Sequence, residues 1–200
     1  EYSLIEDLFK QAGIILARDL AEMMDFATIL AYQPLPRGPR VGIASMSGGA
    51  GVMASDAIIE AGLVLAPLES ESLSYFQKLL PEWAVASHPL DLEPLMEIVG
   101  GHEGNRIGLE IILRDPNVDM CLLVVGLGLL HGEEKETLDN TLIPLLLKRK
   151  KPIVISLIGP KQQCEILTTQ LGEMKVPAYP MVRSAAESLA ALYQYSKAAA

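Results

Sequence analysis

"VGIASMSGGAGVMASDAIIE", residues 41–60, joins an apolar run, a glycine-rich turn and an amphipathic segment in that order. A short run rich in Val, Ile and Ala is typical of a buried strand, and apolar residues at helical spacing after it indicate a helix. The glycines between them free the backbone to turn sharply. The stretch therefore predicts a strand over 41–46, a turn over 47–51 and a helix near 50–61.

The same alternation continues along the chain. Further strands are expected at 63–67, 119–125, 152–157 and, weakly, 177–180, and helices near 71–80, 104–115, 133–149, 161–173 and 184–197. Strands that are nearly all apolar and are joined by helical crossovers form parallel sheets that are covered on both faces. The sequence therefore predicts a doubly wound α/β fold with a five-stranded parallel sheet of order 2-1-3-4-5, which binds ligands at its carboxyl edge.

Two segments depart from this alternation. Residues 3–33 predict two leading helices, and "PLPRGPR" (34–40) ends them with three prolines and a glycine. We therefore divide the chain into a helical leader with a Pro-rich connector, 1–39, and a sheet domain, 40–200. The leader has an apolar face, so we expect it to dock on the sheet domain or on a second copy in a homo-oligomer. Residues 81–103 fit no period and are expected to form a long loop.

Composition excludes several classes of function. With 25 acidic and 16 basic residues the net charge is −9, which opposes a nucleic-acid partner. The basic run Lys148–Lys151 is expected to be a solvated helix end. No apolar run reaches about 18 residues and no leader peptide begins the chain, so we expect a soluble, cytoplasmic protein without a membrane partner.

Metal and disulfide chemistry are also unexpected. Cys121 and Cys164 are too few and too far apart for a disulfide framework and are expected to be packing residues. The three histidines, at 88, 102 and 131, have no metal-ligand spacing, so no metal site is predicted. Because the chain begins at Glu1, we expect it to be a piece of a longer protein.

The glycine turn is the leading candidate site. The first amides of a helix have no partners within the helix and point outward with the positive end of its dipole, which suits an anion. We therefore expect phosphate to bind at the turn, at Ser47, Gly48, Gly49, Ala50 and Gly51. The turn lacks the lysine of a mononucleotide P-loop.

Two other interpretations of the turn stay open. Gly49-x-Gly51-x-x-Ala54, with Glu69 about 20 residues further on, matches a dinucleotide fingerprint, so an NAD(P)-binding domain is one alternative. In the other, the small residues only let the helix pack closely on the strand.

Several motifs resemble a known family. The "AYQPLPRG" connector (31–38), the glycine turn, "SHPLDL" (87–92), "DPNVDMCLLVV" (115–125) and "KKPIVISLIG" (150–159) resemble the carboxy-terminal part of the alpha subunit of NDP-forming acyl-CoA synthetases. These relatives of succinyl-CoA synthetase convert acyl-CoA, ADP and phosphate into acid, CoA and ATP. The resemblance covers nearly the whole chain and implies a flavodoxin-like ligase-CoA domain.

The resemblance also implies what surrounds this domain. A phosphorylated histidine is expected upstream, so this fragment has no catalytic residue of its own and is expected to be inactive alone. Its glycine turn would face that phosphohistidine. CoA-binding, phosphohistidine and ATP-grasp units would be its partners, and CoA and ADP or ATP with Mg²⁺ would bind in the full enzyme, none of them firmly in this fragment.

One position departs from the family. His88 stands where the family has Asn, beside Asp91 in a loop that is expected to lie near the site. His88 could be a nucleophile for phosphate or, more simply, part of a turn, and Asp91 could orient a partner group or close the loop through its backbone. The departure also leaves open a non-catalytic regulatory module of the same fold.

Overall fold

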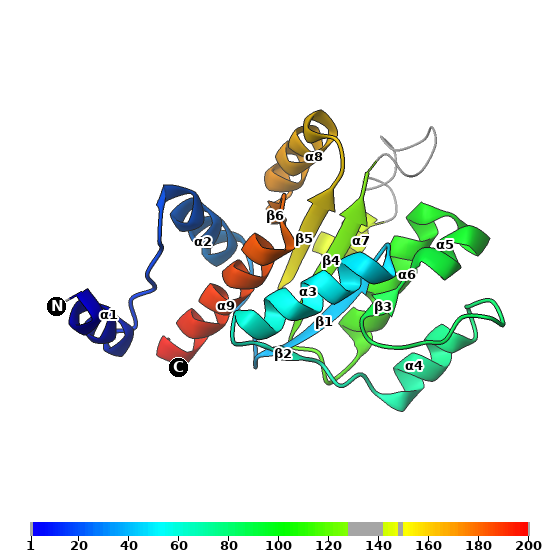
Figure 1. The fold of residues 1–200 in the computed structure, drawn as a ribbon, viewed down its shortest axis with the longest axis horizontal. Coiled ribbons are helices and arrows are strands. Elements are labelled where there is room, and N and C mark those ends of the chain that lie inside the picture. The colour runs from blue at the N-terminus through cyan, green and yellow to red at the C-terminus, as the bar shows by residue number, and fades with distance from the viewer. Residues whose placement is uncertain (1, 128–141, 148–149, 200) are drawn as a thin grey trace.

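A computed structural model of the chain describes residues 2–127, 142–147 and 150–199, and its centre is a parallel sheet. The strands are β1 (Arg40–Ser45), β2 (Val64–Leu65), β3 (Leu90–Asp91), β4 (Met120–Gly126), β5 (Ile153–Ile158) and β6 (Ala178–Tyr179). They lie in the order β2-β1-β4-β5-β6, with β3 paired to β1 as well (Figure 1). Without β3 this is the predicted order 2-1-3-4-5, so the predicted doubly wound fold is confirmed.

Strand β3 shares one edge of β1 with β2. β2 pairs with Arg40 and Val41 at the start of β1, whereas β3 pairs with Ala44 and Ser45 at its end. β4 pairs along the other edge of β1. The end of β1 therefore lies between β3 and β4.

The expectation of a long loop over 81–103 is wrong. This segment contains β3, α5 (Glu93–Val99) and the start of α6 (Gly101–Arg114). Gly100, with φ of +82°, separates the two helices. A two-residue strand and a seven-residue helix are too short to show a period in the sequence, which explains the error.

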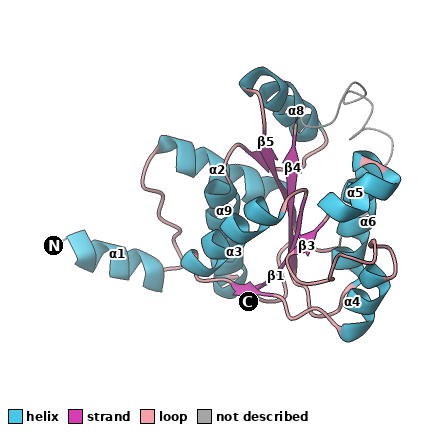
Figure 2. Cartoon of the chain, turned by 45° about the vertical axis from the view of Figure 1, so that its right-hand side comes forward, coloured by secondary structure: helices cyan, strands magenta, loops and turns pink. Residues whose placement is uncertain are grey.

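Helices cover both faces of the sheet (Figure 2). On one face lie α2 (Leu20–Tyr32), α3 (Gly48–Glu60) and α9 (Val182–Ala198), and on the other α4 (Ser70–Gln77), α5, α6, α7 (Ile143–Leu147) and α8 (Lys161–Glu173). β4 contributes to both cores by alternation: Met120, Leu122 and Val124 face the first group of helices, and Cys121, Leu123 and Val125 the second. Every residue of β4 is buried, as expected for a central parallel strand.

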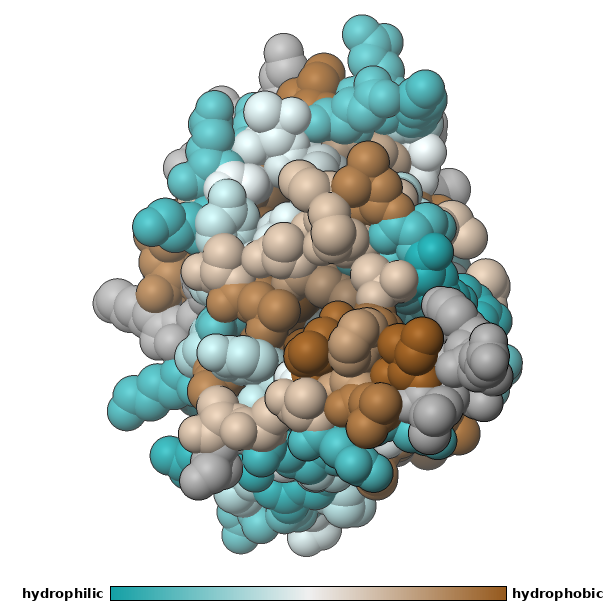
Figure 3. Space-filling view, turned by 90° about the vertical axis from the view of Figure 1, so that its left-hand side faces the viewer, coloured by the Kyte–Doolittle hydropathy of each residue, from teal (hydrophilic) through white to brown (hydrophobic). Residues whose placement is uncertain are grey.

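The leading helices α1 (Tyr2–Gln11) and α2 are present as predicted. α2 contacts α9, and Gln33 at its end accepts a hydrogen bond from the Ile153 amide (2.9 Å) and donates one to the Lys175 carbonyl (3.2 Å). The connector is thus tied to the sheet at β5. Large apolar side chains of the leader nevertheless stay exposed, and apolar residues gather on the face in Figure 3. Those exposed among the described residues of 1–39 are Ile5, Leu8, Phe9, Ile14, Leu20, Met23, Met24 and Leu35.

Three further expectations concern the helix at 133–149, membrane-spanning segments and the two cysteines. Of the helix expected at 133–149 the described residues show only α7, and the rest of that range, like His131, lies outside them. Among the described helices none is both long and apolar enough to span a membrane. Both cysteines are free thiols, and burial raises the pKa of the Cys121 thiol to about 12, as expected of a packing residue.

Candidate phosphate-binding site at the glycine turn

The glycine turn connects the end of β1 to the start of α3. Ser47 is the N-cap of α3, and its hydroxyl accepts a hydrogen bond from the Ala50 amide (3.2 Å). The Ser45 hydroxyl donates to the Ser47 carbonyl (2.8 Å), and the Gly51 amide donates to the same carbonyl (3.0 Å). Serine side chains therefore hold the turn in place, as N-caps do.

Two amides of the turn remain open. The amides of Ala50 and Gly51 donate hydrogen bonds within the turn, whereas those of Gly48 and Gly49 donate none to any described residue. Gly48 is half-buried and Gly49 is exposed. Of the five residues expected to bind phosphate, Gly48 and Gly49 are thus the ones whose backbone amides are available to an anion.

The glycines of the turn have different surroundings. A Cβ on Gly51 would lie 3.4 Å from Pro89 and 3.5 Å from Ser45, so Gly51 allows α3 to pack closely on β1 and on the segment before β3. A Cβ on Gly49 would meet no atom within 4 Å. Close packing therefore accounts for Gly51 but not for Gly49.

Asp91 lies beside the turn, as the sequence predicted for a loop near the site. β3 pairs Asp91 with Ser45, and Asp91 Oδ2 would lie 2.9 Å from a Cβ on Gly48. Its other carboxylate oxygen accepts a hydrogen bond from the Glu93 amide (3.1 Å). A carboxylate near the first turn of a helix interacts favourably with the helix dipole. The same carboxylate repels any other anion that approaches Gly48.

His88 makes a contact with β1 rather than with the turn. Its Nε2 accepts a hydrogen bond from the backbone amide of Ile43 (2.8 Å). Ile43 lies between the residues of β1 that pair with β2 and those that pair with β3, so His88 supplies the acceptor that a strand would supply there. Burial lowers the pKa of His88 to about 4, with a smaller opposing effect from Asp115. A neutral histidine whose Nε2 is taken by the backbone is poorly suited to attack phosphate.

The predicted dinucleotide site does not assemble. The Glu69 amide donates to Asp115 Oδ2 (2.8 Å), and Asp115 precedes the start of β4. The glycine turn follows the end of β1, and parallel strands place all their starts at one edge of the sheet and all their ends at the other. Glu69 and the turn are therefore at opposite ends of the sheet, so the pairing of Gly49 and Gly51 with Glu69 for NAD(P) is wrong.

The carboxyl edge continues past β4 and β5. Met46 Sδ fills the space beside Gly126, and the Leu127 amide donates to the Ile158 carbonyl (2.7 Å). Within the described ranges, no group of three or more His, Cys, Asp or Glu side chains is placed to hold a metal ion. Among the described residues, this edge offers hydrogen bonding from the N-terminus of α3, with the Asp91 carboxylate beside it.

Curated relatives match the chain along its whole length. The acetate–CoA ligase [ADP-forming] II subunit alpha of Pyrococcus furiosus is 30% identical over an alignment of 200 residues, which covers 98% of this chain and 42% of the relative. Subunit alpha of acetate–CoA ligase I from the same organism is 30% identical over 195 residues, covering 94% of this chain and 40% of the relative. The 4-hydroxybutyrate–CoA ligase [ADP-forming] of Nitrosopumilus maritimus is 28% identical and covers 96% of this chain.

Solved structures agree with these relatives. A crystal structure of a protein from Pyrococcus horikoshii matches with a TM-score of 0.85 and 26% identity, covering 98% of this chain and 44% of that one. The apo form of acetyl-coenzyme A synthetase 1 from Candidatus Korarchaeum cryptofilum matches with a TM-score of 0.79 and 26% identity, covering 99% of this chain and 42% of that one. No protein-family model matches the chain. In sequence and fold the chain is therefore similar to part of the ADP-forming acyl-CoA synthetases, and it spans about two fifths of the length of the alpha subunits it matches.

Proposed function

We propose that this chain is the ligase-CoA part of an ADP-forming acyl-CoA synthetase, with residues 1–39 as its helical leader and 40–200 as its sheet domain. In this proposal the amides of Gly48 and Gly49 stabilise a phosphoryl group carried by a histidine of a neighbouring domain. The observation that supports it is the pair of open amides at the N-terminus of α3.

The chemistry of phosphoryl transfer suits such a site. In the transition state, negative charge is spread over three oxygens, and catalysis depends mainly on positioning and electrostatic stabilisation. Backbone amides that are already fixed by Ser45 and Ser47 need no reorganisation to donate to those oxygens. Loss of one such donor typically costs about 3 kcal/mol of transition-state stabilisation.

Asp91 restricts the direction of approach. Because its carboxylate lies against Gly48, a phosphoryl group meets less repulsion on the side of Gly49, where the surface is open. We propose that the incoming phosphohistidine contacts Gly49 first. The Asp91 carboxylate also repels other anions that approach Gly48.

The remaining partners follow from the relatives. The curated relatives are named as ligases that form ADP and use CoA. In the proposed full enzyme, the CoA and the ADP or ATP with Mg²⁺ that take part in the reaction bind to CoA-binding and ATP-grasp units. The exposed apolar residues of the leader are a candidate contact with those units or with a second copy. Because His88 makes a structural contact, its departure from the family's Asn lends no support to a non-catalytic module.

A chimaera tests this function. The matching segment of the Pyrococcus furiosus subunit alpha is replaced by this chain, and ATP formation from acetyl-CoA, ADP and phosphate is measured with its partner subunit. We expect Gly49→Asp to reduce the rate at least 100-fold and Gly49→Asn to retain most of it. Both side chains fit the open space, so they differ mainly in charge.

A second measurement follows phosphorylation of the histidine in the same chimaera. Labelling with radioactive phosphate should show less phosphohistidine in Gly49→Asp than in Gly49→Asn at equal protein, with equal far-UV circular dichroism. Equal activity and equal labelling of the two variants would overturn the proposal.

A further inference from the structure

A cavity lies at the edge of the sheet opposite the glycine turn. It has a volume of about 860 Å³ and is bordered by residues that precede β1, β4 and β5 and by the ends of α6 and α7. Among the described residues, its cationic lining residues are Arg37, Arg40, Arg114, Lys150 and Lys151, and its one carboxylate is Asp119. A lining with five cations and one anion is unexpected in a chain whose net charge is −9.

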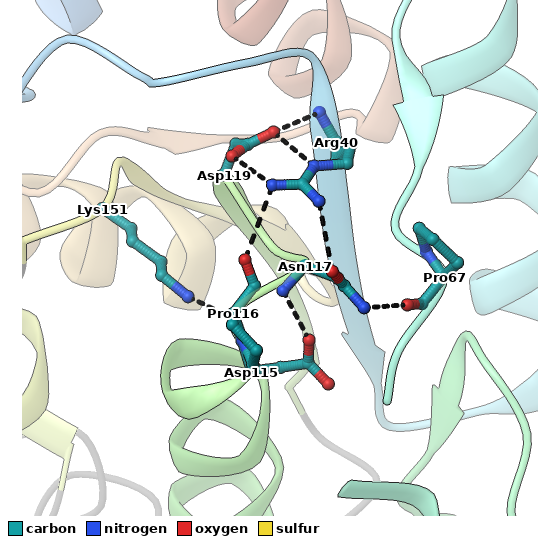
Figure 4. A network of polar contacts seen from close by, with 7 residues as sticks. All are labelled: Arg40, Pro67, Asp115, Pro116, Asn117, Asp119 and Lys151. Atoms are coloured by element: carbon teal, nitrogen blue, oxygen red, sulfur yellow. Dashed lines mark hydrogen bonds and ion pairs between the residues drawn. The ribbon is translucent and has the colours of Figure 1, made fainter. Parts of the chain in front are cut away.

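Part of this positive charge is neutralised within the protein. Arg40 Nε donates to Asp119 Oδ2 (2.8 Å) and one of its terminal nitrogens to Oδ1 (3.0 Å), and the same guanidinium reaches Asn117 Oδ1 (3.3 Å), as Figure 4 shows. Arg114 pairs with Glu110. The Arg40–Asp119 pair therefore forms a fixed part of the wall rather than a free charge.

Three cations of the cavity have no carboxylate partner among the described residues: Arg37, Lys150 and Lys151. Lys151 is half-buried, and its Nζ donates to the Asp115 carbonyl (Figure 4). Burial lowers the pKa of Lys151. The basic run Lys148–Lys151, expected from the sequence to be a solvated helix end, thus includes a lysine that is held toward a cavity. A bound anion would stabilise the charge of this lysine.

The rest of the lining is apolar. Leu35, Leu113, Val118 and Leu145 contribute aliphatic side chains, and prolines lie between them. Small-molecule sites combine such apolar walls with a few charged groups that fix orientation, in volumes of about 300–1,000 Å³. Arg and Lys are the side chains that bind phosphate groups most directly.

We propose that this cavity binds a phosphate-bearing small molecule of nucleotide size, with its phosphates on Arg37, Lys150 and Lys151 and its apolar part against Leu35 and Leu113. The site is independent of the glycine turn, because the two lie at opposite ends of the parallel strands. It gives the chain a ligand of its own, in addition to the phosphoryl group proposed for the turn.

The test titrates the 200-residue chain with ADP and follows binding by calorimetry and by the amide signals of the ¹⁵N-labelled protein. Adenosine and pyrophosphate are titrated separately to distinguish the apolar and anionic contributions. The variant Arg37→Glu/Lys150→Glu reverses two exposed charges of the cavity. Its control, Lys78→Glu/Lys197→Glu, makes the same change in net charge at exposed residues outside the cavity.

We expect saturable binding of ADP, weaker binding of pyrophosphate and still weaker binding of adenosine. The shifted amides should include Gly38, Arg114 and Lys150, and affinity should fall at least tenfold in the cavity variant but not in the control. Absence of saturable ADP binding, an equal loss in both variants, or shifts confined to Gly48 and Gly49 would each overturn the inference. The last of these results would leave the function proposed for the turn intact.

Discussion

Asp91 Oδ2 lies against Gly48, where a Cβ would approach it to 2.9 Å. The carboxylate therefore sets the charge next to the two open amides of the turn. Two like charges about 5 Å apart at a protein surface repel each other by roughly 3 kcal/mol before screening by salt. Removing the charge of Asp91 should consequently favour an anion at Gly48 and Gly49.

The first prediction is that Asp91→Asn binds phosphate about tenfold more tightly than the wild type, because Asn retains the shape and loses the charge. Calorimetry with phosphate at low salt measures the difference. Asp56→Asn, on an exposed position of α3, is the control and should change affinity much less. If Asp91→Asn and the wild type bind phosphate with equal affinity, the Asp91 carboxylate does not control phosphate binding at the turn.

The second prediction concerns packing of β1 on α6. A Cβ on Gly42 would lie 2.4 Å from Ile112 Cγ2 and 2.9 Å from Val118 Cγ2. Gly42→Ala should therefore lower the free energy of unfolding by about 1–3 kcal/mol through overpacking. Gly49→Ala, which meets open space on a helix, should leave stability unchanged or raise it by up to about 1 kcal/mol. Urea unfolding measures the free energy of unfolding of both variants. Equal values for Gly42→Ala and Gly49→Ala would contradict the packing described for Gly42.

The third prediction concerns the contact between His88 and β1. His88→Ala leaves the Ile43 amide buried without an acceptor, which should lower the free energy of unfolding by about 1–3 kcal/mol. His88→Asn restores a side-chain oxygen and should recover part of this loss. Hydrogen exchange of the Ile43 amide provides a local readout: it should be faster in His88→Ala than in His88→Asn. The same rate in both would show that His88 is not the acceptor.

The fourth prediction is a dependence of stability on pH. The pKa of His88 is lowered by burial to about 4 in the folded protein, against about 6.5 in an unfolded chain. Between these values the unfolded state binds more protons, so folding weakens as pH falls through that range. The loss should approach about 3 kcal/mol at pH 4, and His88→Asn should lack it. Urea unfolding at pH 7 and at pH 4.5 gives the difference in the free energy of unfolding between the wild type and His88→Asn. If this difference is the same at both pH values, His88 is not buried in its neutral form.

Sheet order was predictable from the sequence because its main strands are short, nearly all-apolar runs between helical segments. β3 was not, since two residues show no alternation and β3 exists only through its pairing with Ala44 and Ser45. The turn between β1 and α3 was predictable from its glycines, whereas the Ser47 N-cap was found only in the structure. Binding of an anion at this turn stays a prediction.

The surroundings of the glycine turn depend on contacts that the spacing of residues in the sequence does not show. Asp91 was expected near the turn, but its contact with Gly48 comes from β3, a strand that the sequence did not predict. His88 suggested chemistry by its residue type, yet it serves a backbone amide 45 positions away. Glu69 had the expected spacing for a dinucleotide site, but β2 pairs only with the first residues of β1 and leads the chain toward Asp115.

The most direct test follows the amide signals of Gly48 and Gly49 while phosphoramidate, which carries the P–N bond of a phosphohistidine, is added to the ¹⁵N-labelled chain. Both signals should shift saturably in the wild type and in Gly49→Asn, and neither should shift in Gly49→Asp. Signals of Gly48 and Gly49 that stay in place up to the highest concentration of phosphoramidate, while the protein remains folded, would contradict the proposal that this turn binds a phosphoryl group.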